Sequence, residues 1–318
     1  MKKYFGIMVV TLLLASCGKV AKQGGKVIEK EAIEKIAKGT ISKTLKERVE
    51  VVAGKEAAPQ LIKSLESNPN LLSLLEKNGN LLNSWVYLNK QLPTRSLDCD
   101  FVKMFALSEK YSKTGYFGGN KIENFVFKEG SDGEVLISSK LGEKLGKIST
   151  SVEPPLVTLY EVNGAKTVRN MFANLHPFPN AQYDLAGVKY KTDSWGRIIE
   201  GDFSIDKSYV SKPNIYYPKD ITAAGKVKGA LAGDDGGHLF GQQFGGSSSI
   251  LNVVPMKSTL NRGDYLAMER LWKKAADEGK AITAKVKLKY GNDATERPSW
   301  IEVKYDIDGE KVTKLFEN

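Results

Sequence analysis

The spacing of apolar residues in the first third of the chain is typical of amphipathic helices. Between residues 27 and 52 they recur at short intervals with charged residues between them, the pattern of a helix with one buried face. Similar patterns predict helices over 57–67, 70–78, 81–91 and 98–112. Asn-Pro-Asn and Asn-Gly-Asn breaks separate some of them. We expect their leucines to form the core of a small bundle: Leu61, Leu65, Leu71, Leu74, Leu75, Leu81 and Leu82.

Near residue 117 the pattern changes to short strand-like runs. Two of them, 124–127 and 134–137, flank a Gly-Ser-Asp-Gly turn and predict a hairpin. Beyond the polar segment 149–155, only 261–278 is strongly helical. The further strand-like runs are 156–161, 188–191, 197–203, 250–254, 282–288, 300–306 and 311–316.

This change of pattern predicts an α+β protein, with a helical N-terminal module followed by a mainly antiparallel sheet. We expect residues 1–17 to be a signal peptide and 18–115 a helical spacer or interaction module. Residues 116–155 would form a β-hairpin connector, and 156–318 a second, mainly β domain. A chain of this length can bury two hydrophobic cores.

The N-terminus has the parts of an export signal. Lys2 and Lys3 precede an apolar run, 4–14, that is too short to span a bilayer. The Leu-Ala-Ser-Cys that ends at Cys17 resembles the lipobox of bacterial lipoproteins, in which the cysteine is lipidated. We expect a lipid anchor at Cys17 and display on the bacterial envelope, at the outer membrane or cell surface. The alternative is an ordinary secretory signal with a chance cysteine.

The chain has two cysteines, so a lipidated Cys17 would leave Cys99 without a partner. We therefore expect Cys99 to be a buried thiol, with no disulfide framework. The sequence holds no CxxC and no Cys/His cluster, which argues against structural zinc.

The net charge of +10 is unevenly spread. Residues 184–318 carry 21 Lys and Arg against 19 Asp and Glu, a net of +2. A phosphate-binding surface there must come from local placement, for instance Lys285, Lys287 and Lys289 along one side of a strand. Solvated lysines explain this row equally well, so charge alone is weak support for nucleic-acid binding.

The most distinctive polar stretch is Gly-Asp-Asp-Gly-Gly-His, which ends at His238. His238 is one of two histidines in the chain, and Asn252, Asn261 and Glu269 follow it. A neutral imidazole can take a proton from water, while oxygen ligands hold a divalent cation that neutralises charge on a phosphate. This combination suits hydrolysis of a phosphodiester. The simpler alternative is a surface histidine in a flexible hairpin.

Several short elements occur in order through this half of the chain: Tyr190–Arg197, Gly233–Leu239, Asn252–Met256, Leu260–Gly263, Met268-Glu269, Tyr290 and Arg297-Pro298. With these elements, residues 180–318 resemble the DNA/RNA non-specific endonuclease family of the ββα-metal (His-Me finger) nucleases. The resemblance implies a ββα-metal motif with His238 as general base. It also implies that Asn261 binds the metal and that Glu269 holds metal-bound water. Asn252 would support the loop or the phosphate, and Arg197 would contact phosphate in catalysis.

One position departs from the family pattern. The better-studied branch has Asp-Arg-Gly-His, whereas Gly236 stands in the place of the arginine. We expect Arg197 or Arg262 to supply the missing positive charge at the phosphate.

Each of these residues also has a simpler explanation. Asn261 could cap the helix that follows, and Glu269 could be a solvated carboxylate, about 80° round that helix from Asn261. Asn252 could be a strand-edge turn residue. His176 fits an ordinary loop histidine. Asp234 and Asp235 could be turn formers.

Together these features predict a metal-dependent, sugar-non-specific endonuclease that hydrolyses DNA and RNA at the bacterial surface. The oxygen ligands favour Mg²⁺, with Mn²⁺ or Ca²⁺ as alternatives. The expected partners are DNA, RNA and, through Cys17, a membrane; a cognate inhibitor protein stays open. The alternative function is a catalytically weak nucleic-acid-binding or adhesive lipoprotein.

Overall fold

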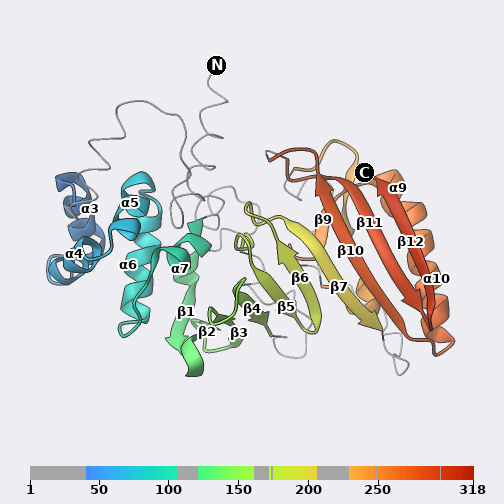
Figure 1. Cartoon of the computed structure of the whole chain (residues 1–318), viewed down its shortest axis with the longest axis horizontal. Helices are drawn as coiled ribbons and strands as arrows, with labels where there is room; N and C mark the ends of the chain where they lie inside the picture. Colours follow the sequence, from blue (N-terminus) through green and yellow to red (C-terminus); the bar gives the residue numbers. More distant parts are fainter. Residues whose placement is uncertain are drawn as a thin grey trace, which may run out of the picture. The chain divides into compact units, whose positions relative to one another are not determined.

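The computed structural model describes residues 41–106, 121–160, 172, 175–205, 229–247, 249–293 and 295–318 (Figure 1). Contacts divide the chain into two compact units, with the division after Lys110. The predicted signal peptide and its Cys17 lie outside the described residues. Among the helices that are described, none is long and apolar enough to cross a membrane. The predicted domain borders at 115 and 155 stay predictions.

The first unit is helical over its described residues. Three helices begin at a capping side chain: Ser42, Asn68 and Asp98 accept a hydrogen bond from the backbone N–H three residues on, at 3.2, 3.1 and 2.8 Å. The predicted leucine core is confirmed, except that Leu61 is only half-buried. The helices are α3 (Lys43–Ala53), α4 (Ala58–Glu66), α5 (Pro69–Lys77), α6 (Leu81–Gln91) and α7 (Cys99–Met104).

Cys99, at the start of α7, is 5% exposed, as the sequence predicts. The expectation of a thiol is wrong, because Cys99 is disulfide-bonded in this structure. That expectation assumed that lipid occupies the only other cysteine, Cys17. One sulfur cannot carry both a disulfide and a thioether-linked lipid, so the two assignments exclude each other.

The second unit is built on a ten-stranded sheet in the order β1-β2-β3-β4-β5-β6-β7-β10-β11-β12. All neighbouring strands are antiparallel except the parallel pair β4–β5, which confirms the predicted mainly antiparallel sheet. The predicted hairpin connector continues into the same sheet through β3 and β4. The strands are β1 (Phe125–Glu129), β2 (Glu134–Ser139), β3 (Lys144–Ser149), β4 (Leu156–Leu159), β5 (Gln182–Leu185), β6 (Val188–Thr192), β7 (Ile198–Ile205), β10 (Ile282–Tyr290), β11 (Pro298–Ile307) and β12 (Glu310–Glu317).

A smaller, two-stranded sheet carries the predicted histidine. It pairs β8 (Asp234–His238) with β9 (Val253–Lys257), and helices α9 (Ser258–Arg262) and α10 (Asp264–Asp277) follow. These elements form the ββα arrangement that the sequence predicts. The single helix expected over 261–278 is instead two helices that break at Gly263. A Cβ at residue 263 would overlap the Thr259 carbonyl oxygen, so the bend requires glycine.

α10 packs against one face of the large sheet (Figure 1). Its Trp272 lies 6.4 Å from Phe203 of β7 and 5.6 Å from Tyr305 of β11, measured between ring centroids. Phe240, which follows β8, stacks on Phe203 at 4.6 Å. The loop after His238 and α10 therefore share this face, which we call the inner face.

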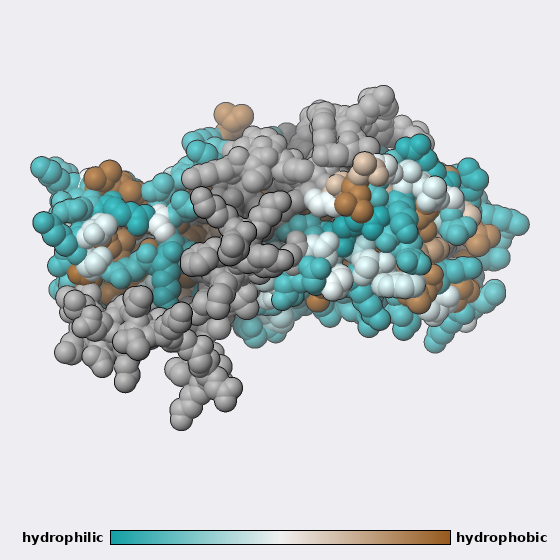
Figure 2. All heavy atoms as spheres, turned by 90° about the horizontal axis from the view of Figure 1, so that it is seen from above, coloured by the Kyte–Doolittle hydropathy of each residue, from teal (hydrophilic) through white to brown (hydrophobic). Residues whose placement is uncertain are grey.

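The row of lysines on β10 lies on the opposite face. Ile282, Ala284, Val286 and Leu288 are buried, and successive side chains of a strand point to opposite sides of its sheet. Lys285, Lys287 and Lys289 therefore point away from α10, and Lys285 is paired with Glu200 at 3.1 Å. On the face shown in Figure 2, the residues coloured by hydropathy are mostly hydrophilic, with scattered hydrophobic ones. This row is a solvated face and does not belong to the site around His238.

Candidate active site

His238 ends β8, where it pairs with Val253 of β9. Part of the residue stays exposed, but its Nε2 atom is buried and has no hydrogen-bond partner. Burial lowers the pKa of His238 to about 4, because the protein interior disfavours the charged imidazolium. The ring is therefore neutral at physiological pH, which is the form that accepts a proton.

Asn252 closes the loop that follows His238. Its Oδ1 accepts from the Phe240 N–H at 3.1 Å, and its Nδ2 donates to the Phe240 and Ser247 carbonyls at 2.9 and 2.7 Å. Asn252 is 0% exposed. The structure therefore contradicts the predicted phosphate contact of Asn252 and places it in the other expected role, support of the loop.

Glu269, on α10, lies against the same loop. Its Oε1 is buried without a partner, and a Cβ at Gly241 would lie 2.7 Å from that oxygen. Burial raises the pKa of Glu269 to about 7, and the Gly241 N–H bond offsets part of this effect. One turn earlier, Tyr265 donates to the Leu239 carbonyl at 2.7 Å. Glu269 is thus a held carboxyl group and not a solvated one.

Asn261 and Arg262 meet at one carboxylate, that of Asp235 on β8. Asn261 Nδ2 donates to Asp235 Oδ2 at 3.0 Å. Arg262 donates from Nε and one terminal nitrogen to the two oxygens, at 2.8 and 2.6 Å. Asn261 lies in the last turn of α9, and α10 has no side-chain cap. The expected helix-capping role of Asn261 is therefore wrong, and so is the 80° angle to Glu269, which assumed one continuous helix.

Arg262 is exposed, whereas Arg197 is not. The Arg262 side chain is 73% exposed although it is paired, so it can also contact a bound phosphate. Arg197 is 9% exposed. Of the two arginines expected to replace the missing charge at Gly236, only Arg262 has an accessible guanidinium beside Asn261.

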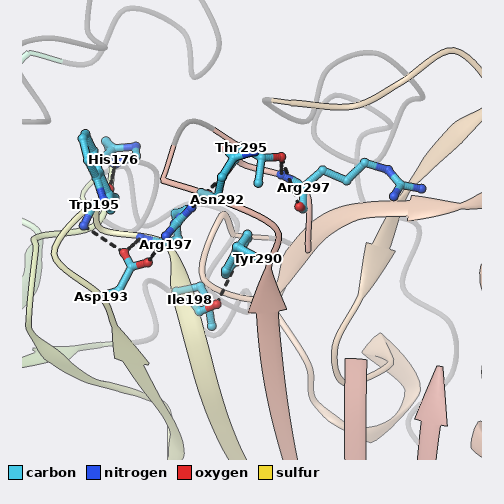
Figure 3. Close-up of polar contacts among 9 residues, drawn as sticks. All are labelled: His176, Asp193, Trp195, Arg197, Ile198, Tyr290, Asn292, Thr295 and Arg297. Atoms are coloured by element: carbon cyan, nitrogen blue, oxygen red, sulfur yellow. Dashed lines mark hydrogen bonds and ion pairs between the residues drawn. The ribbon is translucent and has the colours of Figure 1, made fainter. Parts of the chain in front are cut away.

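The surroundings of Arg197 explain its burial (Figure 3). Its Nε and one terminal nitrogen contact Asp193 Oδ2, both at 2.7 Å. The other terminal nitrogen donates to the carbonyls of Asn292 and Thr295 at 2.8 Å each. The guanidinium also lies 4.3 Å from the centre of the Tyr290 ring. All three guanidinium nitrogens are engaged, so the structure contradicts the predicted phosphate contact of Arg197.

Arg197 instead braces the loop that leads to Arg297, whose side chain points away from the Arg197 cluster in Figure 3. Arg297 pairs with Asp234 at the start of β8, with contacts of 2.7 and 3.0 Å. This pair is largely buried and holds the pKa of Asp234 below its usual value. Asp234 and Asp235 are therefore each clamped by an arginine, and they are more than turn formers.

His176 is the other histidine. It is 7% exposed, and its Nε2 lies 3.0 Å from the Trp195 carbonyl. It also packs against Gly196, where a Cβ would lie 2.9 Å from Nε2. The expected loop position is confirmed, but the residue is buried and structurally engaged.

Two of the predicted site residues carry the type of donor atom that a hard divalent cation prefers. Glu269 and Asn261 offer oxygen atoms, which Mg²⁺, Mn²⁺ and Ca²⁺ prefer. The buried, unpartnered Glu269 Oε1 is a polar atom that still requires a partner. Within the described part of the chain, no group of three or more His, Cys, Asp or Glu could enclose a metal. Water and substrate would therefore complete the coordination shell.

Sequence reasoning did not assign the contacts that hold these groups in place. Asp235 of the hairpin binds Asn261, and Tyr265, Arg297 and Asn318 contact the hairpin or its loop from positions far along the chain. The two adjacent aspartates before His238 are a sequence signal for these contacts, because two neighbouring carboxylates require cationic partners when they are partly buried.

The model of the family described as DNA/RNA non-specific endonuclease matches residues 179–309. Type VII secretion system protein EssD of Staphylococcus aureus is 29% identical over 182 residues, which cover 51% of this chain and 29% of the relative. The probable deoxyribonuclease RhsA of Dickeya dadantii is 35% identical over 88 residues, covering 27% of this chain and 6% of the relative. The chain thus spans under a third of the length of these relatives.

Two solved structures of NucA from Streptococcus agalactiae also align with the chain. The one with no metal bound has 20% identity and a TM-score of 0.32, and the one with magnesium ion bound has 19% identity and a TM-score of 0.34. Each alignment covers 50% of this chain and 78% of NucA. The family match and the sequence relatives agree that residues 179–309 are similar to the DNA/RNA non-specific endonuclease family.

Proposed function

We propose that the protein is a metal-dependent endonuclease that hydrolyses phosphodiester bonds of both DNA and RNA. The observation that carries the proposal is the buried, unpartnered Nε2 of His238. Its low pKa of about 4 keeps the ring neutral. Several buried side-chain atoms of the described residues lack a hydrogen-bond partner, and His238 Nε2 is the one imidazole nitrogen among them, a group that can take a proton from water.

In this proposal His238 takes a proton from the attacking water. The Asn252 bonds fix the loop that follows His238, and β9 fixes its backbone. A fixed ring keeps its acceptor nitrogen in one place, and binding of substrate and water would have to open access to this buried atom before it accepts the proton. Because the ring is already neutral, no proton has to leave before it can act as a base.

Asn261 and Glu269 would hold the cation, for which we propose Mg²⁺. The Asp235 carboxylate accepts the Asn261 Nδ2–H, which leaves the amide oxygen as the free ligand atom. Glu269 would bind the cation or one of its waters. When bound, a divalent cation stabilises negative charge on the phosphate and on the departing oxygen.

Arg262 would supply the positive charge that Gly236 does not. Its guanidinium is oriented by Asp235, next to Asn261, and stays exposed. A phosphate oxygen could therefore replace or share one of the Asp235 bonds. This arrangement needs no contact to a base or to the 2′-position of the sugar, in keeping with a substrate that is either DNA or RNA.

We also propose that the mature protein is anchored to the bacterial envelope through lipid at Cys17, in which case Cys99 has no disulfide to Cys17 in that form. A cognate inhibitor protein is a further partner that we propose. A Cys17→Ser variant should then leave the membrane fraction and lose the lipid mass. An intact disulfide between Cys17 and Cys99 in the mature protein would rule out the anchor, because it uses the same sulfur.

A digestion assay tests the activity directly. Purified residues 18–318 should degrade both plasmid DNA and RNA with Mg²⁺, lose the activity in EDTA, and regain it when Mg²⁺ or Mn²⁺ is added back. Full activity in chelator would contradict the metal requirement. Binding without cleavage would favour the second candidate, a catalytically weak nucleic-acid-binding or adhesive lipoprotein, for which the absence of an arginine at Gly236 is the best support.

A further inference from the structure

We propose that Asn318 is a positioning residue of the candidate active site. It follows β12, beyond residue 309, where the family match ends. The inference rests on the proposed function, because it assigns Asn318 a part in placing Asn261 and the β8–β9 hairpin.

The side-chain amide of Asn318 is buried and fully used. Oδ1 accepts from the Lys257 N–H at 2.8 Å, and Nδ2 donates to the carbonyls of Pro255 and Pro298, each at 2.8 Å. The Asn318 backbone N–H donates to the Ser299 carbonyl at 2.9 Å. With 6% of its surface exposed, Asn318 joins β9 to β11.

This contact takes the place of strand pairing. In an antiparallel pair, alternate residues direct their N–H and C=O groups away from the partner strand. The Pro255 C=O and the Lys257 N–H are two residues apart on β9 and both meet the Asn318 amide. The amide therefore binds the edge of β9 as a peptide group of a neighbouring strand would. It links the two-stranded sheet to the ten-stranded one.

The position of the contact connects it to the proposed metal site. Lys257 is the last residue of β9, and α9 begins at the next residue without a side-chain cap. Asn261 lies on α9, one turn after Lys257. The bond to the Lys257 N–H therefore fixes the origin of the helix that presents Asn261.

The other strand of the hairpin, β8, is held directly opposite Lys257. Lys257 is the register partner of Asp234, which Arg297 clamps. Pro298, whose carbonyl accepts from Asn318, is the next residue after Arg297. One short segment of β11 thus secures both strands of the hairpin, β8 through Arg297 and β9 through Asn318.

Asn318→Ala and Asn318→Asp test the proposal in the full chain. The aspartate keeps the shape and the acceptor but loses both donors and places a negative oxygen against two carbonyls. We expect kcat to fall about 10- to 100-fold in both variants, as for other residues that orient a metal ligand, with KM within about 3-fold. Mn²⁺ binding without nucleic acid should weaken as well. Glu317→Ala, an exposed neighbour on β12, is the matched control and should behave as wild type.

Amide hydrogen exchange separates positioning from general stability. Exchange across 253–262 should rise in the Asn318 variants, while β10 keeps its protection. A kcat within about 2-fold of wild type, with unchanged exchange, would overturn the proposal. Loss of protection throughout the second unit, or failure of both variants to fold, would overturn it too, since Asn318 would then support the whole fold. If wild type cleaves no substrate, the proposed function fails, and exchange across 253–262 alone decides whether Asn318 holds the hairpin.

Discussion

The groups around Arg197 and those around His238 are both largely buried, but they differ in how completely they are satisfied. Every guanidinium nitrogen of Arg197 has a partner in the surrounding turns. The Nε2 of His238 and the Oε1 of Glu269 have none. Both regions carry residues that the sequence marks as catalytic. This difference separates the Arg197 cluster, which holds the fold together, from the His238 region, to which we assign the chemistry in our proposal.

The largest expected effect is on catalysis by His238→Ala. Removing the proposed base should lower kcat about 10²- to 10⁴-fold, with little change in nucleic-acid binding. The fold should be retained, because no hydrogen bond of the Nε2 atom is lost. Steady-state rates with plasmid DNA at fixed Mg²⁺ measure this change.

His176→Ala is the matched control. Its imidazole contacts the Trp195 carbonyl in a buried position, so this variant should melt earlier and keep its rate per folded molecule. Wild-type cleavage by His238→Ala would remove that histidine from the mechanism. The proposed contrast between a structural Arg197 cluster and a catalytic His238 region would then be wrong.

Arg197→Ala should show the opposite result. It removes the ion-pair partner of Asp193 Oδ2 and the side-chain donor of two carbonyls, and removing one member of a buried ion pair costs about 3–5 kcal/mol. We expect the free energy of unfolding to fall by that amount in urea denaturation, while kcat per folded molecule changes little. A stable variant with a raised KM would instead restore Arg197 as a phosphate contact.

Arg262→Ala should have a smaller effect, mainly on activity. The Arg262 side chain is largely exposed, whereas its partner Asp235 is not, so the free energy of unfolding should fall by less than in Arg197→Ala. Loss of one charge-assisted contact to phosphate should lower kcat/KM on the order of tenfold. Arg262→Lys keeps the charge but not the two-pronged bond to Asp235, and should recover only part of the activity. An unchanged kcat/KM in Arg262→Ala would leave the charge missing at Gly236 without a replacement.

The smallest expected effect is that of pH above 5. Burial lowers the pKa of His238 to about 4, so the proton-accepting neutral form predominates above that value and is lost as the pH falls through it. At saturating metal, the rate should therefore vary by about 2-fold or less between pH 5.5 and 8, and drop only near pH 4. An inflection near pH 7 would assign the limiting group to Glu269, whose pKa burial raises to about 7.

Much of the fold follows from local patterns in the sequence. Helical spacing predicts the leucine core of the first unit, and alternation predicts β10, because both depend on which face of an element is apolar. The break at Gly263 does not follow from the sequence pattern, although the buried stripe of α10 begins only at Tyr265. The bend depends on the carbonyl of Thr259, which no pattern of side chains reveals.

The sequence by itself determined which residues could carry the chemistry: a rare histidine in a glycine-rich segment, followed by Asn261 and Glu269. It also determined that these residues resemble a nuclease. Only the tertiary structure decided which of the candidates are free to act. Arg197 is engaged by Asn292, 95 residues away, and Asn252 by Phe240 across the hairpin. Asn318, 61 residues from Lys257, holds the strand before Asn261. Whether a polar group is satisfied depends on partners brought together by folding, and this is why the sequence could name these residues without separating catalytic roles from structural ones.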